Sequence, residues 1–422
     1  MRTALALLLT MTLASAARAE NWPGFRGPTG QGVSAETGIP TTFSATENVA
    51  WKTPIPGQGW SSPIVWGDRV FVTTATDSGT ALRLVALDRK AGKVLWDNEV
   101  VRQQPDRKCS QNSFATPTPV TDGERIYVLA FDGSFAAVTM DGAVAWTHRE
   151  FPFYSQHGLS VSPILHKDLL IAPFDWSSRG PDKFEGWQKS WDKSFIYAID
   201  KATGKTRWQG KRGQSRIGHV VPQVAAVDGK DQLISAAGDV VQGFDLETGE
   251  RLWTAATGGE AVVPSIVIGE GLVFATSGFP TKVPEGAVLR AFRMGGKGDV
   301  TAANLAWKDS KDVPMIPSLL YAKPYLYAIT ETGVVRCLKA ATGEVVWRDR
   351  LPGNYSASPV WTEGRITFLS EQGTATVIEA GPEFKVVATN VLGEKCCASP
   401  AVSGGQLFIR TAGNLYCFGQ GK

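Results

Sequence analysis

The sequence is poor in the residues and patterns that build metal centres, helical domains and membrane spans. Its 422 residues include five cysteines and four histidines, and these form no HExxH or paired CxxC spacing. CxxCH is absent as well, which excludes a covalently attached c-type haem. Helical periodicity is nearly absent after residue 19, and no later stretch approaches the roughly 18 apolar residues that a membrane helix needs. We therefore predict no metal site and no membrane span.

The first 19 residues have the layout of a secretory signal peptide. Arg2 provides the basic start, residues 5–13 form an apolar core too short to span a bilayer, and residues 17–19 read Ala-Arg-Ala, a small-x-small cleavage motif. We expect cleavage after Ala19 and a periplasmic or secreted protein, and a buried N-terminal helix is the alternative. No cysteine follows the apolar core, so no lipid anchor is expected.

The net charge argues against nucleic acid and anionic lipid as partners, and the cysteine count argues against a disulfide-stabilised fold. Removal of residues 1–19 leaves 41 basic and 40 acidic residues, a net charge of +1. A chain so close to neutrality lacks the excess of basic residues that attracts nucleic acid or anionic lipid. Five cysteines do not make a disulfide framework, although the compartment to which the protein is exported permits disulfide bonds.

A short phrase that ends in tryptophan recurs along the chain. Full copies are DRKAGKVLW (88–96), DKATGKTRW (200–208), DLETGERLW (245–253) and KAATGEVVW (339–347), and weaker ones occur elsewhere. A phrase that returns every 40–60 residues indicates a repeat architecture. An indole on the outermost strand of a repeat buries apolar area against the neighbouring sheet while its N–H reaches a backbone acceptor. We therefore predict a structural role for seven tryptophans, which are Trp51, Trp96, Trp146, Trp208, Trp253, Trp307 and Trp347.

A second marker, a proline with a neighbouring serine or threonine followed by apolar residues, runs in step with the tryptophans. It occurs eight times, at 62–64, 118–120, 162–164, 222–224, 264–266, 317–319, 358–360 and 399–401, the fourth copy without the hydroxyl residue. Turn signals and alternating strand residues follow, so most units contain four short strands with glycine-containing turns. This pattern predicts an all-β fold, an eight-bladed β-propeller of four-stranded antiparallel blades. Seven blades or a split ring are the alternatives.

The two chain ends are predicted to close the ring. The last unit ends after its third strand, at residues 414–418, and residues 48–51 can supply its missing fourth strand. Pairing of the N-terminal strand with the C-terminal blade removes an exposed sheet edge. The predicted organisation is a signal peptide over 1–19, a strap over 20–47 and the propeller over 48–422. The strap either caps the propeller or reaches another molecule.

The repeat resembles that of a known family. The phrase A-x-D-x-x-T-G-x-x-x-W, with its best copy from Ala198 to Trp208, is similar to the repeat of pyrroloquinoline-quinone (PQQ) enzymes. It is also similar to the repeat of their cofactor-free relatives, including the propeller lipoprotein of the outer-membrane assembly machinery. The resemblance covers residues 48–422 and implies eight blades. The opening at 22–28 resembles the start of exported bacterial PQQ-like repeat proteins of unassigned role. A fold likeness does not by itself assign an activity.

We expect the functional site on the propeller face that gathers the loops between blades and the loops between second and third strands. His157, His219 and Glu260 are the candidate catalytic residues, with the histidines as general bases or ligands. The alternative is a polar cluster that only hydrogen-bonds its own loops. The candidate ligand-binding residues are Trp60, Asn112, Tyr154, His157, Asp175, Trp176, Arg179, Arg216, His219, Glu260, Tyr355, Cys396 and Cys397.

Two local features of this face have alternative explanations. The segment 175–192 inserts three tryptophans between two strands, and it is either a lid or stacking wall for a ligand or a flap folded on its own blade. A bridge between adjacent cysteines lies against the cofactor in alcohol-oxidising PQQ enzymes, but Cys396 and Cys397 occur in a late loop, whereas those enzymes carry the pair early. The alternative is one buried thiol with a chance neighbour.

The leading functional hypothesis is an exported binding or scaffold protein for a small molecule, a carbohydrate or a protein. A PQQ- and calcium-dependent oxidoreductase of alcohols or sugars is the alternative, and the resemblance supplies Glu260, Asn112 and Asp175 as residue types suited to its calcium and base. A scaffold similar to the outer-membrane assembly factor is a weaker alternative. A lyase or hydrolase that uses His157 and His219 stays open, so the sequence does not decide whether the protein is an enzyme.

Overall fold

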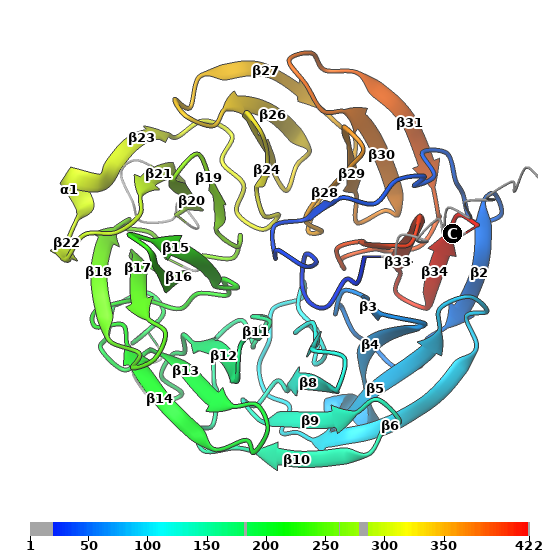
Figure 1. The fold of residues 1–422 in the computed structure, drawn as a ribbon, viewed down its shortest axis with the longest axis horizontal. Coiled ribbons are helices and arrows are strands. Elements are labelled where there is room, and N and C mark those ends of the chain that lie inside the picture. Colours follow the sequence, from blue (N-terminus) through cyan, green and yellow to red (C-terminus); the bar gives the residue numbers. More distant parts are fainter. Residues whose placement is uncertain (1–19, 181–183, 261, 278–285, 421–422) are drawn as a thin grey trace, which may run out of the picture.

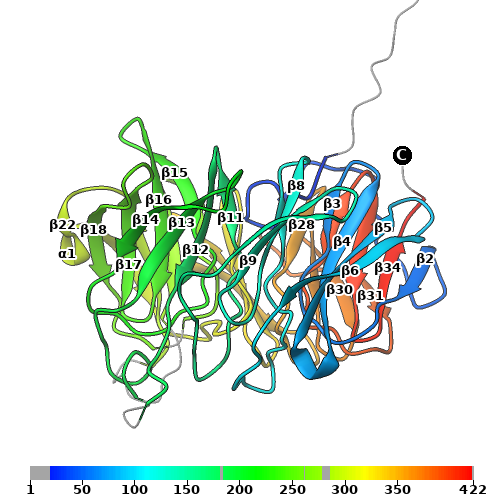
Figure 2. The same cartoon turned by 90° about the horizontal axis from the view of Figure 1, so that it is seen from below.

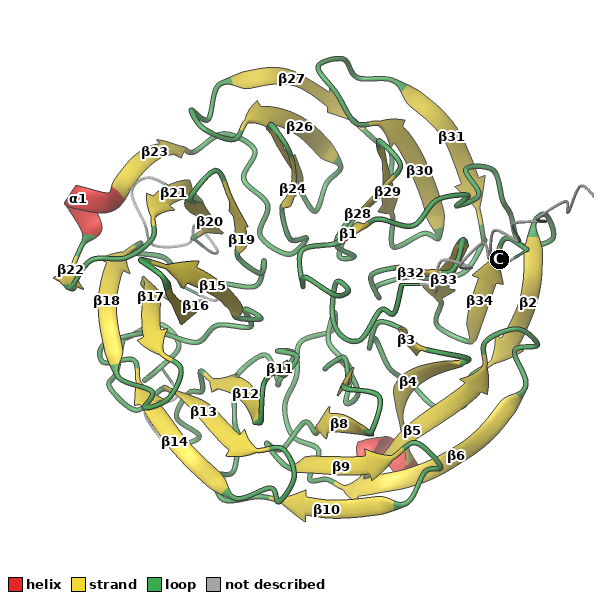
Figure 3. Ribbon diagram, viewed as in Figure 1, coloured by secondary structure: helices red, strands yellow, loops and turns green. Residues whose placement is uncertain are grey.

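The protein is a ring of eight antiparallel sheets around a central axis (Figure 1), as the repeats predict. The computed structural model describes residues 20–180, 184–260, 262–277 and 286–420. The predicted signal peptide lies outside these residues. Helix is confined there to η1 (Asp77–Gly79) and α1 (Thr301–Asn304), and strands make up the blades (Figure 3).

Each blade contributes four strands from the axis outward. The first four blades are β3 (Ile64–Trp66), β4 (Arg69–Thr76), β5 (Ala81–Asp88), β6 (Val94–Arg102); β7 (Val120–Thr121), β8 (Arg125–Leu129), β9 (Phe135–Thr139), β10 (Val144–His148); β11 (Ile164–His166), β12 (Leu169–Phe174), β13 (Phe195–Asp200), β14 (Thr206–Lys211); and β15 (Gln223–Val227), β16 (Lys230–Ala237), β17 (Val240–Asp245), β18 (Arg251–Ala256).

The last four blades follow the same order around the ring. They are β19 (Val267–Gly269), β20 (Leu272–Thr276), β21 (Leu289–Arg293), β23 (Leu305–Asp309); β24 (Leu320–Ala322), β25 (Tyr325–Ile329), β26 (Val334–Lys339), β27 (Val345–Arg350); β28 (Val360–Thr362), β29 (Arg365–Leu369), β30 (Thr374–Glu379), β31 (Val386–Val391); and β32 (Ala401–Ser403), β33 (Gln406–Arg410), β34 (Asn414–Phe418), β2 (Val49–Pro54). Two short strands, β22 (Gly298–Asp299) and β1 (Val33–Ser34), add in parallel to β18 and β28.

The chain ends close the ring as predicted. Strand β2 pairs antiparallel with β34, with Val49 opposite Phe418 and Lys52 opposite Tyr416. The eighth blade therefore joins the first residues of the propeller to the last. Glu394 reinforces this closure, since its carboxylate accepts hydrogen bonds from Lys52 at 3.2 Å and from the Tyr416 hydroxyl at 3.1 Å.

The repeated tryptophans lie at the seams between blades. Six indole N–H groups donate to a backbone carbonyl of the next blade, at Arg89, Met140, Lys201, Leu246, Ala340 and Gly381. Trp253 instead donates to Gln232 of its own blade, and β22 pairs with its strand from outside. Two constraints require glycine in the turn of the phrase, as Gly249 shows. Its φ of +73° is a left-handed conformation, and a Cβ on it would lie 2.5 Å from the Trp208 ring.

Residues 20–47 cross the middle of the ring on one face, where they form the dark blue segment of Figure 1 and lie at the top of Figure 2. Trp22 exchanges two backbone hydrogen bonds of 2.8 Å with Val65 of the first blade. The guanidinium of Arg26 donates to the Leu319 carbonyl at 2.6 Å, just before the sixth blade. Trp22 and Arg26 are buried, so this segment packs on the propeller and covers one end of its axis.

Candidate functional site

A central funnel of about 380 Å³ opens among the loops between blades. Its wall includes Trp60, His157, His219 and Cys397 from four of these loops, and the strap contributes Phe25 to the lining. Hydroxyl, amide, imidazole, thiol and apolar side chains line it, and none of the lining residues carries a carboxylate, ammonium or guanidinium group. The funnel is therefore an uncharged pocket whenever its histidines are neutral.

A ring of hydroxyl side chains surrounds the funnel where the chain enters each blade. The Ser62 N–H donates to the Thr118 hydroxyl at 2.9 Å, and the same contact recurs at seven of the eight joints with lengths of 2.9–3.2 Å. Each hydroxyl accepts the N–H of the preceding blade and keeps its own hydrogen as a donor. We call this set the hydroxyl ring; its members are Ser62, Thr118, Ser162, Ser265, Ser318, Ser358 and Ser399. The ring explains the serine of the Ser-Pro marker, for which the sequence alone gave no reason.

The joint between the third and fourth blades lacks this contact. Val221 stands where the other blades have a hydroxyl residue, and it lines the funnel. The loops on either side of this joint carry the two funnel histidines, His157 before the third blade and His219 before the fourth. The two imidazoles of the funnel therefore lie on the side where the hydroxyl ring is interrupted.

His157 and His219 form a pair with ring centroids 6.4 Å apart. Burial, and then the charge of His157, lower the pKa of His219 to about 3. Burial is also the main cause that lowers the pKa of His157, with Arg107 adding to it and Glu260 opposing it. Both imidazoles are therefore neutral at neutral pH. Among the described residues neither ring nitrogen of His219 has a hydrogen-bond partner, although its side chain is only 7% exposed.

Asn112 fixes the loop that holds His157, and Trp187 packs against the His157 ring. The Asn112 amide donates to the carbonyls of His157 at 3.0 Å and Leu159 at 3.3 Å. The Trp187 ring lies edge to face against His157 at 5.6 Å between centroids. On another part of the rim, the Lys395 ammonium lies 5.7 Å above the Trp60 ring. Asn112 therefore has a positioning role in addition to its place in the funnel wall.

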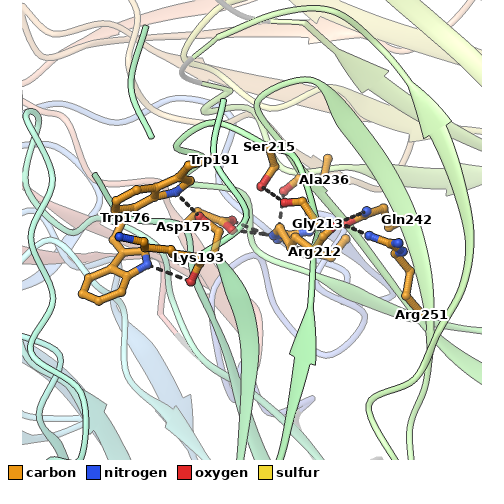
Figure 4. Close-up of polar contacts among 12 residues, drawn as sticks. Asp175, Trp176, Trp191, Lys193, Arg212, Gly213, Ser215, Ala236, Gln242 and Arg251 are labelled. Atoms are coloured by element: carbon orange, nitrogen blue, oxygen red, sulfur yellow. Dashed lines mark hydrogen bonds and ion pairs between the residues drawn. The ribbon is translucent and has the colours of Figure 1, made fainter. Parts of the chain in front are cut away.

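Asp175, Trp176 and Trp191, near the two ends of the insertion, contact residues of their own blade (Figure 4). Asp175 forms a fully buried ion pair with Arg212, with one N–O distance of 2.8 Å. The indole of Trp176 donates to the Lys193 carbonyl at 3.0 Å, and that of Trp191 donates to the Ser194 hydroxyl at 3.1 Å. These contacts match the flap interpretation for Trp176 and Trp191, whereas Trp187 reaches a funnel histidine.

Arg179 and Arg216 are both engaged in ion pairs near the rim. Arg179 lies 2.7 Å from Asp106 and stacks over the Tyr154 ring at 5.0 Å. Arg216 is held by Asp239 at 2.5 Å and contacts Glu260 at 3.5 Å. Neither guanidinium lines the funnel, so neither offers an unpaired charge to a ligand there.

The remaining candidates are core residues or thiols. Tyr355 is 1% exposed and its hydroxyl donates to the Pro352 carbonyl at 3.0 Å, which places it in the core. Cys396 is buried with its thiol 3.4 Å from the Glu394 carbonyl, while Cys397 lines the funnel. Both are free thiols. Burial raises the pKa of the Cys397 thiol to about 12 and raises that of Cys396 as well.

The structure thus brings together five of the thirteen predicted ligand-binding residues in the funnel. These are Trp60, Asn112, His157, His219 and Cys397. The other eight lie outside its lining, namely Tyr154, Asp175, Trp176, Arg179, Arg216, Glu260, Tyr355 and Cys396. The hydroxyl ring and Phe25 were absent from the prediction, although the serine of every Ser-Pro marker was a signal that could have found the ring.

The funnel residues do not fit PQQ with calcium. PQQ is a polycarboxylate, and the lining offers it no basic side chain. Calcium takes several oxygen ligands, usually with carboxylates among them, and the lining has no carboxylate. Across the described residues, no group of three or more His, Cys, Asp or Glu side chains is arranged to hold a metal ion.

The fold and the repeat define a PQQ-like β-propeller. The family model described as outer membrane protein assembly factor BamB matches residues 43–277, 185–310 and 299–382. These matches together span most of the chain, so the protein belongs to this family. The match confirms the resemblance drawn from the tryptophan phrase.

Individual relatives are distant. The outer membrane protein assembly factor BamB of Salmonella typhimurium is 29% identical over 136 residues, which are 31% of this chain and 30% of that protein. A polyvinylalcohol dehydrogenase of a Pseudomonas species is 21% identical over 265 residues, 56% of this chain and 40% of that protein. The chain therefore matches less than half the length of either relative.

Solved structures share the fold. BamB from Moraxella catarrhalis matches with a TM-score of 0.59 and 14% identity, over 88% of this chain and 99% of that one. A europium-containing methanol dehydrogenase matches with a TM-score of 0.53 and 12% identity, over 95% and 98% of the two chains. At these identities the likeness shows the architecture alone. In the part of the chain that the structure describes, no helix has the length and apolar character to cross a membrane.

Proposed function

We propose that this protein is an exported binding protein whose central funnel takes an uncharged, hydroxyl-bearing ligand of the carbohydrate class. The observation that carries the proposal is His219. A buried polar group without a hydrogen-bond partner costs about 1–3 kcal/mol, so a protein retains one mainly where a ligand or water completes it. A neutral imidazole presents one donor and one acceptor, which is the pairing that a sugar hydroxyl satisfies.

The rest of the funnel supports the same class of ligand. Its volume of about 380 Å³ lies at the small end of the range for ligand pockets. Trp60 supplies an apolar ring face, and the hydroxyl ring supplies donors around the wall. The lining has no formal charge at neutral pH to offset the desolvation of an ionic ligand.

The relatives that are dehydrogenases motivate the main alternative, a quinoprotein oxidoreductase. The funnel lacks the carboxylates and basic groups that calcium and PQQ would require, which counts against it. His157 and His219 leave room for an enzyme that acts on a neutral sugar, but neither of the two carboxylates that most glycosidases use lines the funnel.

A binding assay separates these functions. The exported chain is titrated by calorimetry with glucose, N-acetylglucosamine, maltose and cellobiose, and separately with PQQ and calcium. We expect at least one neutral sugar to bind, and His219→Phe to weaken that binding about tenfold, since one hydrogen-bonding partner is removed. His166→Phe, on a histidine outside the funnel, is the matched control and should bind as the wild type does. Binding of PQQ with calcium, or of none of the sugars, would refute the proposal.

One observation favours a scaffold role as a second candidate. Val386 and Val391 are 44% and 57% exposed on β31, the outer edge of a blade that lacks the tryptophan. An exposed apolar edge strand can accept an additional strand from a partner. The family's assembly-factor description suits such pairing. Val391→Lys should abolish pairing with a synthetic amphipathic strand peptide while leaving sugar binding intact.

A further inference from the structure

The eighth joint of the hydroxyl ring is chemically different from the other seven. At those seven, the N–H of the residue two positions before one blade's first strand donates to the hydroxyl of the corresponding residue of the next blade. At the eighth, the donor is the Ser162 N–H and the corresponding residue is Val221. Within the described chain the Ser162 N–H makes no hydrogen bond, although Ser162 is 3% exposed and its hydroxyl accepts the Thr118 N–H at 2.9 Å.

The unfilled acceptor position and the unpartnered imidazole belong to the same loop and the same pocket lining. His219 precedes Val221 by two residues, and Ser162, Val221 and His219 all line the funnel. Two independent polar groups of the funnel lining, a backbone N–H and a neutral imidazole, therefore lack hydrogen-bond partners among the described residues. His157 lies next to His219, with the two ring centroids 6.4 Å apart.

We propose that the break in the hydroxyl ring at Val221 is the subsite that seats one oxygen atom of the ligand. The oxygen accepts the Ser162 N–H in place of the missing hydroxyl and exchanges a second hydrogen bond with His219. This inference rests on the proposed function, because it assigns the position of the sugar hydroxyl within the same funnel. Val221 keeps the acceptor position open for the ligand, because a hydroxyl side chain at residue 221 would itself accept the Ser162 N–H.

Another joint of the same ring shows which substitution at Val221 tests the proposal. Thr118 occupies the equivalent position in the second blade and accepts the Ser62 N–H at 2.9 Å. Threonine has nearly the shape of valine, so Val221→Thr can complete the ring with a geometry that already occurs at another joint. Val345→Thr, on the exposed outer strand β27, is the control for the same chemical change away from the funnel.

Three measurements are made on wild type and variants: melting temperature, hydrogen–deuterium exchange of peptides that contain Ser162, and affinity for whichever of the four sugars binds. We expect Val221→Thr to raise the melting temperature, slow exchange at Ser162 and weaken sugar binding about tenfold or more, because it takes the acceptor position of the ligand. Thr118→Val should show the converse at its joint, with faster exchange at Ser62 and a lower melting temperature. Val345→Thr should change neither exchange nor affinity.

The outcomes distinguish this inference from the function on which it rests. If Val221→Thr slows exchange at Ser162 but binds sugar within about twofold of the wild type, the subsite assignment is wrong and the proposed function stands. If exchange at Ser162 is unchanged, the geometric premise fails. If the wild type binds none of the sugars, the proposed function fails and the assignment falls with it, whatever the exchange shows.

Discussion

Replacement of Gly249 by alanine should cost far more stability than the same change at Gly271. Both glycines have left-handed backbone, with φ of +73° and +72°. An alanine carries nearly the same backbone penalty at both positions, about 1–2 kcal/mol. Their surroundings differ: a Cβ at Gly249 would lie 2.5 Å from the Trp208 ring, whereas one at Gly271 meets nothing within 4 Å.

The tryptophan has little freedom to move away. Trp208 is 8% exposed, and its indole N–H donates to the Leu246 carbonyl of the next blade at 3.0 Å. Displacement of a packed ring adds an overpacking cost of about 1–3 kcal/mol. We therefore expect Gly249→Ala to lower the free energy of unfolding by about 2–5 kcal/mol and Gly271→Ala by about 1–2 kcal/mol. Urea denaturation followed by tryptophan fluorescence and circular dichroism measures both.

A third variant isolates the contact. In a Trp208→Leu background the indole is gone, so Gly249→Ala should then cost about as much as Gly271→Ala, and the double-mutant cycle should return the overpacking cost as a coupling energy. Equal losses for the two glycine variants in the wild-type background would refute the idea that seam packing fixes the glycine of the phrase. The requirement would then be one of backbone conformation alone.

The other predictions concern the funnel and the ring closure. His219→Phe should raise the free energy of unfolding by about 1–2 kcal/mol while it weakens sugar binding, since it removes a buried group without a partner; a loss of stability would show that the imidazole is satisfied. Burial lowers the pKa of His219 to about 3 in the folded protein. In the unfolded chain the same imidazole takes up a proton as the pH falls below about 6.5, so protonation favours the unfolded state. His219 should therefore lower the free energy of unfolding between about pH 6.5 and 3. The slope is at most about 1.4 kcal/mol per pH unit, and it should be absent from His219→Phe in urea titrations at each pH. Burial raises the pKa of Glu394, but hydrogen bonds from Thr411, Asn414, Lys52 and Tyr416 outweigh it and lower the pKa to about 2. Glu394 therefore stabilises the closure above about pH 4.5, and this contribution is lost as the pH falls through 2. Glu394→Gln should lower the free energy of unfolding by about 1–3 kcal/mol at pH 7, and a difference that persists at pH 2 would contradict this role.

The fold was predictable because its determinants are local and repeated. Most copies of the phrase contain both halves of a seam, the tryptophan that packs on the next blade and the turn glycine that receives the indole of the preceding blade, as Trp208 and Gly249 show. Repetition along the chain makes such a signal visible in one sequence. The closure by β2 followed from counting strands, since the last unit was one strand short.

The site was less predictable because its residues are defined by where side chains point. Tyr355 and Asp175 are in the expected loops, yet one is part of the core and the other is paired with Arg212. Charged residues such as Arg216 and Glu260 attracted attention as chemistry-bearing groups, but they pair with neighbours outside the funnel. The serines of the Ser-Pro marker served only as a sign of the repeat, and the ring of contacts shows that they line the funnel.

The hydroxyl ring gives a physical reason why the proposed ligand subsite lies at one joint of an eightfold repeat. At seven joints the hydroxyl satisfies the neighbouring backbone N–H, so that N–H is paired before any ligand arrives. A ligand gains little from groups that are already paired, because it must exchange one hydrogen bond for another. Val221 leaves the Ser162 N–H without its partner beside His219. If the proposed subsite is correct, the valine that interrupts the ring leaves one N–H for the ligand, whereas a uniform ring would offer it eight N–H groups that are already paired.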